Sequence, residues 1–430
     1  MNEGERFTGS LVVRDGLIAD ILHEGELVPE DEETIDARGC YLLPGVIDDH
    51  VHMREPGLTH KADMRSETCA AAAGGVTTVL DMPNVKPQTT SLPLLEERYA
   101  MAAERCHVNY GFYLGATNDN LDEIKHIDTS IVPGVKLFMG SSTGNMLVDD
   151  EKALREIFRS CPTLLMTHCE DTKRINQRMH EAQALYGEDP DVSHHPDIRD
   201  RVACLQSTSL AVKLAKETGA RLHVAHLTTR EELDLFAPND KQITAEACVA
   251  HLLWSRKDYG RLGTLIKCNP AIKDVEDRDA LRKALTDGRI CVVGTDHAPH
   301  LLSEKEGGCK KAMSGMPMIQ FSLPSMLGLV DEGVLTLERM VQLMCHNPAL
   351  LLRIRHRGFI RRGYHADLVL VKPDCTWQVS KECILSKCGW SPRMGDQFNW
   401  HVEKTWVNGQ MVWDGCSVNE NILGEAVRIG

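Results

Sequence analysis

Two histidines and an arginine follow a short apolar run near the N-terminus, in the stretch GVIDDHVHMREPG (residues 45–57). One residue separates His50 from His52, and Arg54 follows two residues later. Alternate side chains of a β-strand share a face, so these three side chains can point at one common object. Imidazole nitrogens bind divalent metal ions, and the planar guanidinium of arginine can bind a carboxylate through two parallel hydrogen bonds. The same letters also occur by chance where an ordinary strand ends, and the motif alone leaves both interpretations open.

Polar residues also end several other apolar runs of the chain. Six of the eight runs that we identify end in this way, at His50 and His52, Asn84, Lys136, His168, His226 and Asp296. Neutral imidazoles and carboxylates are typical ligands of zinc and similar divalent ions. Most of the 19 histidines are expected on the surface or in structural roles, so no single histidine identifies a ligand. Their common position at the ends of runs indicates a shared metal site.

Lys136 is the unexpected member of this set, because it lies inside the apolar stretch GVKLFMG. Burying an unpaired ammonium group costs considerable free energy. One interpretation is that Lys136 pairs with a buried acid, or that the strand is shorter and leaves the side chain at its exposed end. The other is that the amine has reacted with CO₂, since the resulting carbamate is a carboxylate on a long stem that can bridge two cations. A nearby pair of metal ions would favour that anion by direct coordination.

The eight apolar runs alternate with segments of helical spacing, from GVIDDHVH at residue 45 to GRICVVGTDHAPH at residue 288. SLPLLEERYAMAAERC, DDEKALREIF and RDRVACLQSTSLAVKLAKETGA are examples of these helical segments. Buried strands separated by helices predict parallel β/α units. A closed (β/α)8 barrel is the most economical arrangement, although the pattern alone does not exclude an open doubly wound sheet. In a barrel, the ends of the runs form the rim on which loops build an active site.

The two ends of the chain resemble each other more than either resembles the middle. SLVVRDGLIADILHEGELV near the N-terminus alternates and is broken by Asp-Gly and Glu-Gly turns. ADLVLVKPD and EKTWVNGQMVWDG near the C-terminus show the same pattern. We therefore predict one small β domain built from both termini. The predicted division assigns residues 1–43 and 353–430 to this domain and residues 44–352 to the barrel.

The composition of the chain limits the classes of molecule that the protein is expected to bind. The chain has 430 residues, a net charge of −14, 42% hydrophobic and 26% charged residues, which argues against a general nucleic-acid or membrane-surface binder. A small anionic substrate remains compatible, since one arginine and a metal can reverse the local field. We expect no signal peptide and no membrane span. The 15 scattered cysteines, without a C-x-x-C motif, indicate reduced thiols and a cytoplasmic protein.

Seven motifs make the chain resemble the amidohydrolase superfamily and, within it, the dihydroorotases. In the order of the family they are DHVHMREPG, DMPN, GVKLFMGSSTG, THCE, HVAHLTT, KCNPA and GTDHAPH. The resemblance covers nearly the whole chain and implies an α/β fold, a distorted (β/α)8 TIM barrel with a small β-sandwich from both chain ends. It implies the reversible hydrolysis of L-dihydroorotate to N-carbamoyl-L-aspartate, a reaction of pyrimidine biosynthesis, and is compatible with a homodimer.

The same resemblance assigns roles around two zinc ions per chain. His50, His52 and Asp296 would bind the more buried ion, His168 and His226 the second, and Lys136, as carboxylysine, would bridge both together with a hydroxide. Asp296 would also be the general acid–base. Substrate binding would involve His52, Arg54, Asn84 and His300, the last three at the free carboxylate, with Asn269 at the ring amide groups and backbone groups around Gly315 closing over the ring.

The chain departs from the family pattern in places, and related enzymes offer alternative functions. The family often has PHHL after the seventh strand, where this chain has VAHLL and keeps only His251, and some members use aspartate in place of the bridging lysine. Allantoinases and hydantoinases share the metals and fold but usually lack an arginine at the position of Arg54, so this residue favours an anionic substrate. A non-catalytic scaffold relative would typically have lost ligands, and every expected ligand type is present here.

Overall fold

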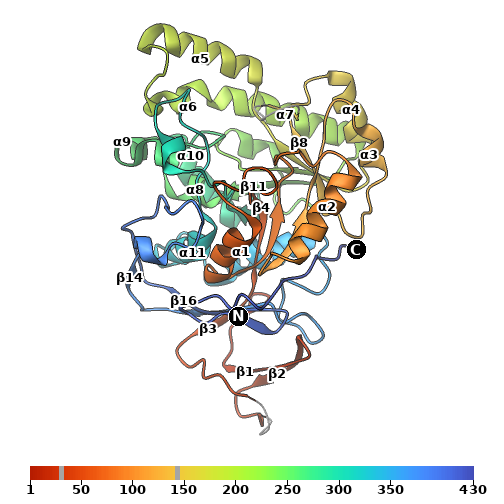
Figure 1. The fold of residues 1–430 in the computed structure, drawn as a ribbon, viewed down its shortest axis with the longest axis vertical. Helices are drawn as coiled ribbons and strands as arrows, with labels where there is room; N and C mark the ends of the chain where they lie inside the picture. Colours follow the sequence, from red (N-terminus) through yellow and green to blue (C-terminus); the bar gives the residue numbers. More distant parts are fainter. Residues whose placement is uncertain (29–32, 141–145) are drawn as a thin grey trace.

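The computed structural model describes residues 1–28, 33–140 and 146–430, so the letters SSTG of one motif lie outside the described residues. Within these residues, eight parallel strands form a barrel that Figure 1 shows in the upper part of the molecule. The strands are β4 (Val46–Val51), β5 (Val76–Asp81), β6 (Asn109–Phe112) continued by β7 (Leu114–Gly115), β8 (Gly134–Phe138), β9 (Leu164–His168), β10 (Leu222–Val224), β11 (Ile243–Cys248) and β12 (Val292–Gly294).

The barrel is closed at both seams between its two groups of strands. One sheet has the order β12-β11-β10-β9-β8-β7 and the other the order β4-β5-β6. At the first seam the N–H of Tyr113, between β6 and β7, donates to the carbonyl of Asp81 at 3.2 Å. At the second, the N–H of His52 donates to the carbonyl of His297 at 2.7 Å, beside a parallel bridge from Val51. These bonds show that the barrel is closed, as predicted, and that the strands do not form an open sheet.

Helices cover the outside of the barrel, as the apolar spacing predicted. Aspartate side chains begin several of them by accepting a hydrogen bond from the third residue of the helix, as Asp63, Asp150 and Asp200 do. The α-helices are α1 (Met64–Ala73), α2 (Leu92–Ala103), α3 (Leu121–Lys125), α4 (Glu151–Ser160), α5 (Thr172–Tyr186), α6 (His195–Ile198), α7 (Arg201–Thr218), α8 (Val249–Leu253), α9 (Tyr259–Leu262), α10 (Val275–Asp287), α11 (Ser322–Asp331), α12 (Leu337–Val341) and α13 (Asn347–Leu351).

Both ends of the chain build a small β-structure below the barrel in Figure 1. Its main sheet has the order β17-β16-β13-β3, all antiparallel, so the N-terminal strand β3 (Tyr41–Pro44) pairs with β13 (Leu368–Lys372) from the C-terminal part. The other two strands of this sheet are β16 (His401–Val407), which pairs with β13, and β17 (Gln410–Trp413) at the edge. Two smaller pairs are β1 (Gly9–Arg14) with β2 (Leu17–His23) and β14 (Trp377–Gln378) with β15 (Gln397–Phe398). The predicted joint β domain is thus present, while its boundaries after residues 43 and 352 stay predictions.

The interior of the barrel is apolar at one end only. Ile47, Leu80, Leu164 and Met166 are each at most 1% exposed and form one cluster, which Ile429 from the end of the chain also joins. Because side chains alternate along a strand, His168 shares the inward face of β9 with Leu164 and Met166 but lies at its carboxyl end. The polar end of the barrel is therefore the one available for chemistry. None of the helices described is both long and apolar enough to cross a membrane.

Candidate active site

A cavity of about 1010 Å³ lies at the carboxyl ends of the barrel strands. Every residue that the sequence analysis placed in the site lines it: His50, His52, Arg54, Asn84, Lys136, His168, His226, Asn269, Asp296, His300 and Gly315. The residues come from six different strands or the turns that follow them and from two further loops, which carry Asn269 and Gly315. The structure brings the whole predicted set together, whereas the role of each residue stays a prediction.

His50, His52 and Asp296 form a compact group of donor atoms. Nε2 of His52 lies 3.0 Å and Nε2 of His50 lies 3.5 Å from Oδ1 of Asp296. Ligand atoms about 2.0–2.1 Å from a tetrahedral zinc ion lie roughly 3.3 Å apart, so the spacing fits one shared ion. All the ligand atoms of these three residues lie within 4.8 Å of one another. This group can hold the more buried cation.

Two hydrogen bonds orient the imidazole rings of this group. Nδ1 of His50 lies 2.9 Å from Oε2 of Glu246, and Nδ1 of His52 lies 2.8 Å from Oδ1 of Asn84. Because an oxygen acceptor requires Nδ1 to carry the proton, Nε2 of each ring keeps its lone pair for a metal. Burial lowers the pKa of His52 to about 4, so its ring is neutral near pH 7. Because the amide oxygen of Asn84 accepts this hydrogen bond from His52, the amide nitrogen of Asn84 can donate into the cavity.

His168 and His226 form a second pair next to the first group, with the ring centroids of His226 and His50 5.2 Å apart. Nδ1 of His168 lies 3.0 Å from Nε2 of His226. The other nitrogen of His168 lies 2.9 Å from Oε2 of Glu170, which also pairs with Arg199. Burial opposes ionisation of Glu170, but Arg199 and His168 outweigh it and lower the pKa of this carboxyl to about 2. An ionised Glu170 fixes the proton of His168 on Nε2 and directs Nδ1 at the position of a second cation.

Lys136 is 1% exposed, and its Nζ has no hydrogen-bond partner among the described residues. Both conventional interpretations are therefore wrong here, because the side chain is neither hydrogen-bonded to an acid nor exposed at a strand end. The register of β8 with β9 pairs Lys136 with Met166 and Phe138 with His168, so Lys136 lies two residues before the position opposite His168. Burial lowers the pKa of Lys136, although Glu246 and Asp296 oppose the shift. A buried amine of this kind is suited to reaction with CO₂, because its neutral form is the nucleophile.

Three site residues have backbone conformations that L-residues seldom adopt. Arg54, His226 and Asp296 have φ angles of 66°, 39° and 48°, in the left-handed region. Such a residue costs on the order of 1–3 kcal/mol, and it persists where the surrounding structure fixes it. All three follow the end of a barrel strand by two or three residues. The turn in the backbone aims their side chains into the cavity, where a continued strand would have carried them past it.

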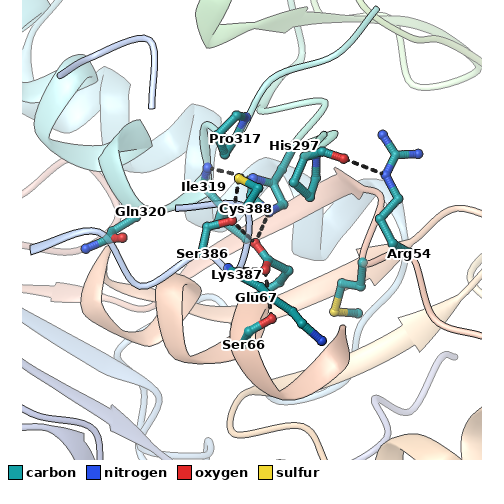
Figure 2. A network of polar contacts seen from close by, with 12 residues as sticks. Arg54, Ser66, Glu67, His297, Pro317, Ile319, Gln320, Ser386, Lys387 and Cys388 are labelled. Atoms are coloured by element: carbon teal, nitrogen blue, oxygen red, sulfur yellow. Dashed lines mark hydrogen bonds and ion pairs between the residues drawn. The ribbon is translucent and has the colours of Figure 1, made fainter. Parts of the chain in front are cut away.

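The segment after β12 is held in place by a buried polar network that Figure 2 shows. Oε2 of Glu67 in α1 accepts from Nε2 of His297 at 2.8 Å and from Ser386 at 2.6 Å. Nδ1 of His297 accepts the N–H groups of Met318 and Ile319 at 3.0 and 3.2 Å. The network joins three distant parts of the chain directly behind Asp296. It fixes the turn on which Asp296 is carried.

Arg54 and the hydrogen-bonded His300 form the side of the cavity that can bind an anion. Nε of Arg54 donates to the carbonyl of Pro299 at 3.0 Å, and its Nη2 lies 3.1 Å from Nε2 of His300. Arg54 and His300 are 8% and 4% exposed, so both present a desolvated edge to the cavity. Hydrogen bonds between ionised partners in such a place are stronger than those at a surface. This side, together with the amide nitrogen of Asn84, can bind a carboxylate.

Gly315 lies in a loop that closes one side of the cavity. Its φ is 128°, and a Cβ at this position would lie only 2.6 Å from the carbonyl oxygen of Ala298, so the site has room only for glycine. Its N–H donates to the carbonyl of Lys267 at 2.8 Å, and its carbonyl accepts from Lys305 at 2.7 Å. Both backbone groups of Gly315 thus have partners within the protein. A substrate contact at this position would come from a neighbouring peptide group such as that of Ser314.

Sequence reasoning missed the carboxylates that orient the histidines. Glu246 is an acid inside an apolar strand, the same signal that drew attention to Lys136, and Glu170 follows His168 by two residues in THCE. His251, noted as a departure from the family pattern, is buried outside the cavity, with Nε2 3.0 Å from the carbonyl of Pro270. A single histidine in VAHLL therefore removes nothing from the site.

Comparison with known proteins agrees with this architecture. A sequence profile of the Amidohydrolase family matches residues 41–412. The "Dihydroorotase" of Halobacterium salinarum is 35% identical over 421 residues, covering 95% of this chain and 96% of that protein. The "Allantoinase" of Streptomyces avermitilis is 31% identical, covering 95% and 92%. The solved structure of "L-Hydantoinase (Dihydropyrimidinase)" from Arthrobacter aurescens superposes with a TM-score of 0.90 at 28% identity, covering 98% and 96%.

The profile spans the barrel and the strands of the terminal sheet, and the relatives cover nearly the full length of the chain. The closed barrel, the terminal sheet shared by both ends, and the histidine and carboxylate groups at the rim are all consistent with that match. This chain belongs to the amidohydrolase family.

Proposed function

We propose that this protein catalyses the reversible hydrolysis of L-dihydroorotate to N-carbamoyl-L-aspartate. The observation that carries the proposal is the position of Arg54 and His300, buried in the same cavity as the histidine and aspartate donors. A cyclic amide with a carboxylate would place its ring at the donors and its charge at Arg54. The curated dihydroorotases that match over about nine-tenths of the chain support this substrate.

The donor set fits two divalent cations, with zinc as the expected metal. His50, His52 and Asp296 would hold one ion, His168 and His226 the other, and carboxylated Lys136 would lie between them. Lys136 supports this proposal because its Nζ is buried without a partner among the described residues, and conversion to a carbamate gives it two oxygens that need cations. Bound ions of this kind supply Lewis acidity and lower the pKa of water, which provides a nucleophile at neutral pH.

Side chains of the protein bind the substrate and transfer the proton. Arg54, Asn84 and His300 bind the carboxylate and hold the ring in one orientation, which supplies the proximity part of catalysis. Asp296 accepts the proton of the attacking water and delivers it to the ring nitrogen that leaves, as a general base and then a general acid. The hydrogen bond from His195 to Oδ1 of Asn269, with Nε2 at 3.2 Å, turns the amide nitrogen of Asn269 toward the ring carbonyls.

A substrate panel tests the proposal. The purified, metal-loaded protein should hydrolyse L-dihydroorotate with a kcat/KM at least about 100-fold above that for allantoin or hydantoin. The reason is that a ring without a carboxylate leaves the buried guanidinium of Arg54 without an anionic partner. Loss of ultraviolet absorbance of each ring compound measures the rate. Preference for allantoin would make the allantoinase relative the better guide, and no turnover of any ring would favour a non-catalytic relative.

Replacing Arg54 with methionine should lower kcat/KM for L-dihydroorotate by about 100-fold, the scale of two lost charge-assisted hydrogen bonds. Its guanidinium contacts Pro299 and His300 but none of the donor atoms, so the metal content should equal that of the wild type. Steady-state kinetics and elemental analysis measure the two quantities together. Unchanged turnover of dihydroorotate would contradict the assignment of Arg54 to the carboxylate.

Two further expectations accompany this function. The cytoplasm is the proposed compartment, supported by 15 cysteines that are all free thiols. A homodimer is the expected assembly from the family resemblance, and light scattering of the purified protein would measure it.

A further inference from the structure

His300 is enclosed between two cations, one at each ring nitrogen. Nη2 of Arg54 lies 3.1 Å from Nε2, and Nζ of Lys61 lies 3.1 Å from Nδ1. The ring and the lysine are each 4% exposed, so water does not separate these charges. Burial, Arg54 and Lys61 hold the pKa of His300 far below its usual range, and the ring is neutral.

A neutral imidazole has one N–H and one lone pair, whereas ammonium and guanidinium groups only donate. His300 can therefore accept a hydrogen bond from Arg54 or from Lys61 but not from both. Its other nitrogen carries a proton that faces a cation, and the backbone of Ser314 is the nearby acceptor that partly relieves this contact. An incoming carboxylate removes this conflict, because Nδ1 then accepts from Lys61 while the Nε2 proton and the Arg54 guanidinium both donate to the anion.

Lys61 is held rigidly enough to impose this arrangement. Its Nζ donates to Oε1 of Glu304 at 2.9 Å, and the other carboxylate oxygen of Glu304 accepts the N–H of Leu301 at 2.9 Å. The carbonyl of His300 accepts from Nε1 of Trp390 at 2.7 Å, which fixes the backbone that carries the ring. Lysine, glutamate and histidine are thus each fixed by a contact outside the substrate-binding edge.

We infer that Lys61 is a positioning residue for carboxylate binding, which it supports by keeping the proton of His300 on Nε2, where it can be donated to the substrate. This inference rests on the proposed function, because it requires a substrate with a carboxylate. Lys61 does not touch the reacting atoms. Its effect should appear in the affinity for the charged substrate and leave the chemical step unchanged.

A competing arrangement makes opposite predictions. Oε2 of Glu304 lies 3.4 Å from Nδ1 of His300, so the ring proton could be on Nδ1 and point at that carboxylate. In that case Nε2 can only accept, His300 offers no proton to an anion, and loss of the Lys61 charge leaves the affinity for the substrate unchanged. Substitution of Lys61 separates the two.

The test uses the full-length, metal-loaded protein with Lys61→Met, Lys61→Arg and Lys86→Met. Lys86 also lines the cavity but is exposed, so its substitution is a matched control for the loss of one positive charge. We expect KM for L-dihydroorotate to rise at least about tenfold in Lys61→Met, the loss of one charge-assisted hydrogen bond, with kcat within about threefold of wild type. Lys61→Arg should recover most of the affinity, and Lys86→Met should stay within about threefold.

An unchanged KM in Lys61→Met, or an equal rise in Lys86→Met, would overturn the inference, and so would a fall in kcat accompanied by loss of metal. If Lys61→Met does not fold, Lys61→Gln is measured in its place and interpreted in the same way. Wild-type protein without activity on L-dihydroorotate would overturn the proposed function itself, and this inference with it. Active wild type with unaltered Lys61 variants overturns the inference alone.

Discussion

Replacing Lys136 with alanine is expected to remove bound metal and to lower kcat for L-dihydroorotate by at least about 1000-fold, beyond the 10–100-fold typical of residues that only support metal ligands. The reason is that Lys136 lines the same cavity as both donor groups and has a buried Nζ that no described residue contacts by a hydrogen bond. As a carbamate it would supply negative charge shared by both cations. Alanine cannot supply that charge, and the two cations would repel each other without it.

Two measurements check this prediction. Elemental analysis should find fewer ions per chain in Lys136→Ala than in wild type, whereas Arg54→Met should keep its metal. Reloading of metal-free wild-type protein should also require bicarbonate, since CO₂ is needed to form the carbamate. Full metal content in Lys136→Ala, or reloading that is indifferent to bicarbonate, would count against a bridging carboxylysine.

The pattern of apolar runs was sufficient to predict the barrel. Each of the eight runs is a strand of the described structure, because parallel strands buried on both faces read as short continuous apolar segments. Polar residues at the ends of runs were informative for the same reason, since only the carboxyl ends of such strands lie next to a cavity. The pattern of runs favoured a closed barrel but did not by itself exclude an open sheet, because closure depends on bonds at Tyr113 and His297 that join residues far apart in sequence.

The partners of the site residues were harder to predict than the residues themselves. Glu246 contacts His50 across 196 positions of sequence, and Lys61 contacts His300 across 239. Spacing identifies residues that share one element, whereas these contacts depend on how neighbouring strands and loops pack. Glu246 and Lys136 share one signal, a charged residue within an apolar strand, and this signal identifies a buried polar site without naming its partner.

Net charge was a poor guide to the chemistry of the cavity. The chain carries −14, but the described residues that line the cavity include seven lysines and arginines and only two carboxylates, Asp296 and Glu304. Most acidic groups lie outside the cavity, and water screens those at the surface, whereas the cations act at short range in a desolvated space. A negatively charged protein can therefore bind an anion, because the local field near Arg54 opposes the field of the whole molecule.

Replacing Asp296 with asparagine is expected to lower kcat by at least about 1000-fold, the combined scale of a lost general base and a lost charged ligand. His50 and the hydrogen-bonded His52 outweigh the effect of burial and hold the pKa of Asp296 far below its usual range, so the wild-type residue is ionised at neutral pH. Asparagine keeps the shape of the side chain but cannot accept a proton. The Glu67–His297 network behind it is untouched, so the fold should be retained, which circular dichroism would show.

Asp48→Asn is the matched control for that substitution. Asp48 is buried next to the same turn and accepts from the N–H and hydroxyl of Thr295 at 3.1 and 2.6 Å. Burial raises the pKa of Asp48 to about 7, so its carboxyl is partly neutral already, and an amide changes its charge much less. We expect Asp48→Asn to lower kcat by less than about tenfold. Equal losses in both variants would mean that Asp296 acts by holding the turn in place, and its assignment as the proton carrier would then be wrong.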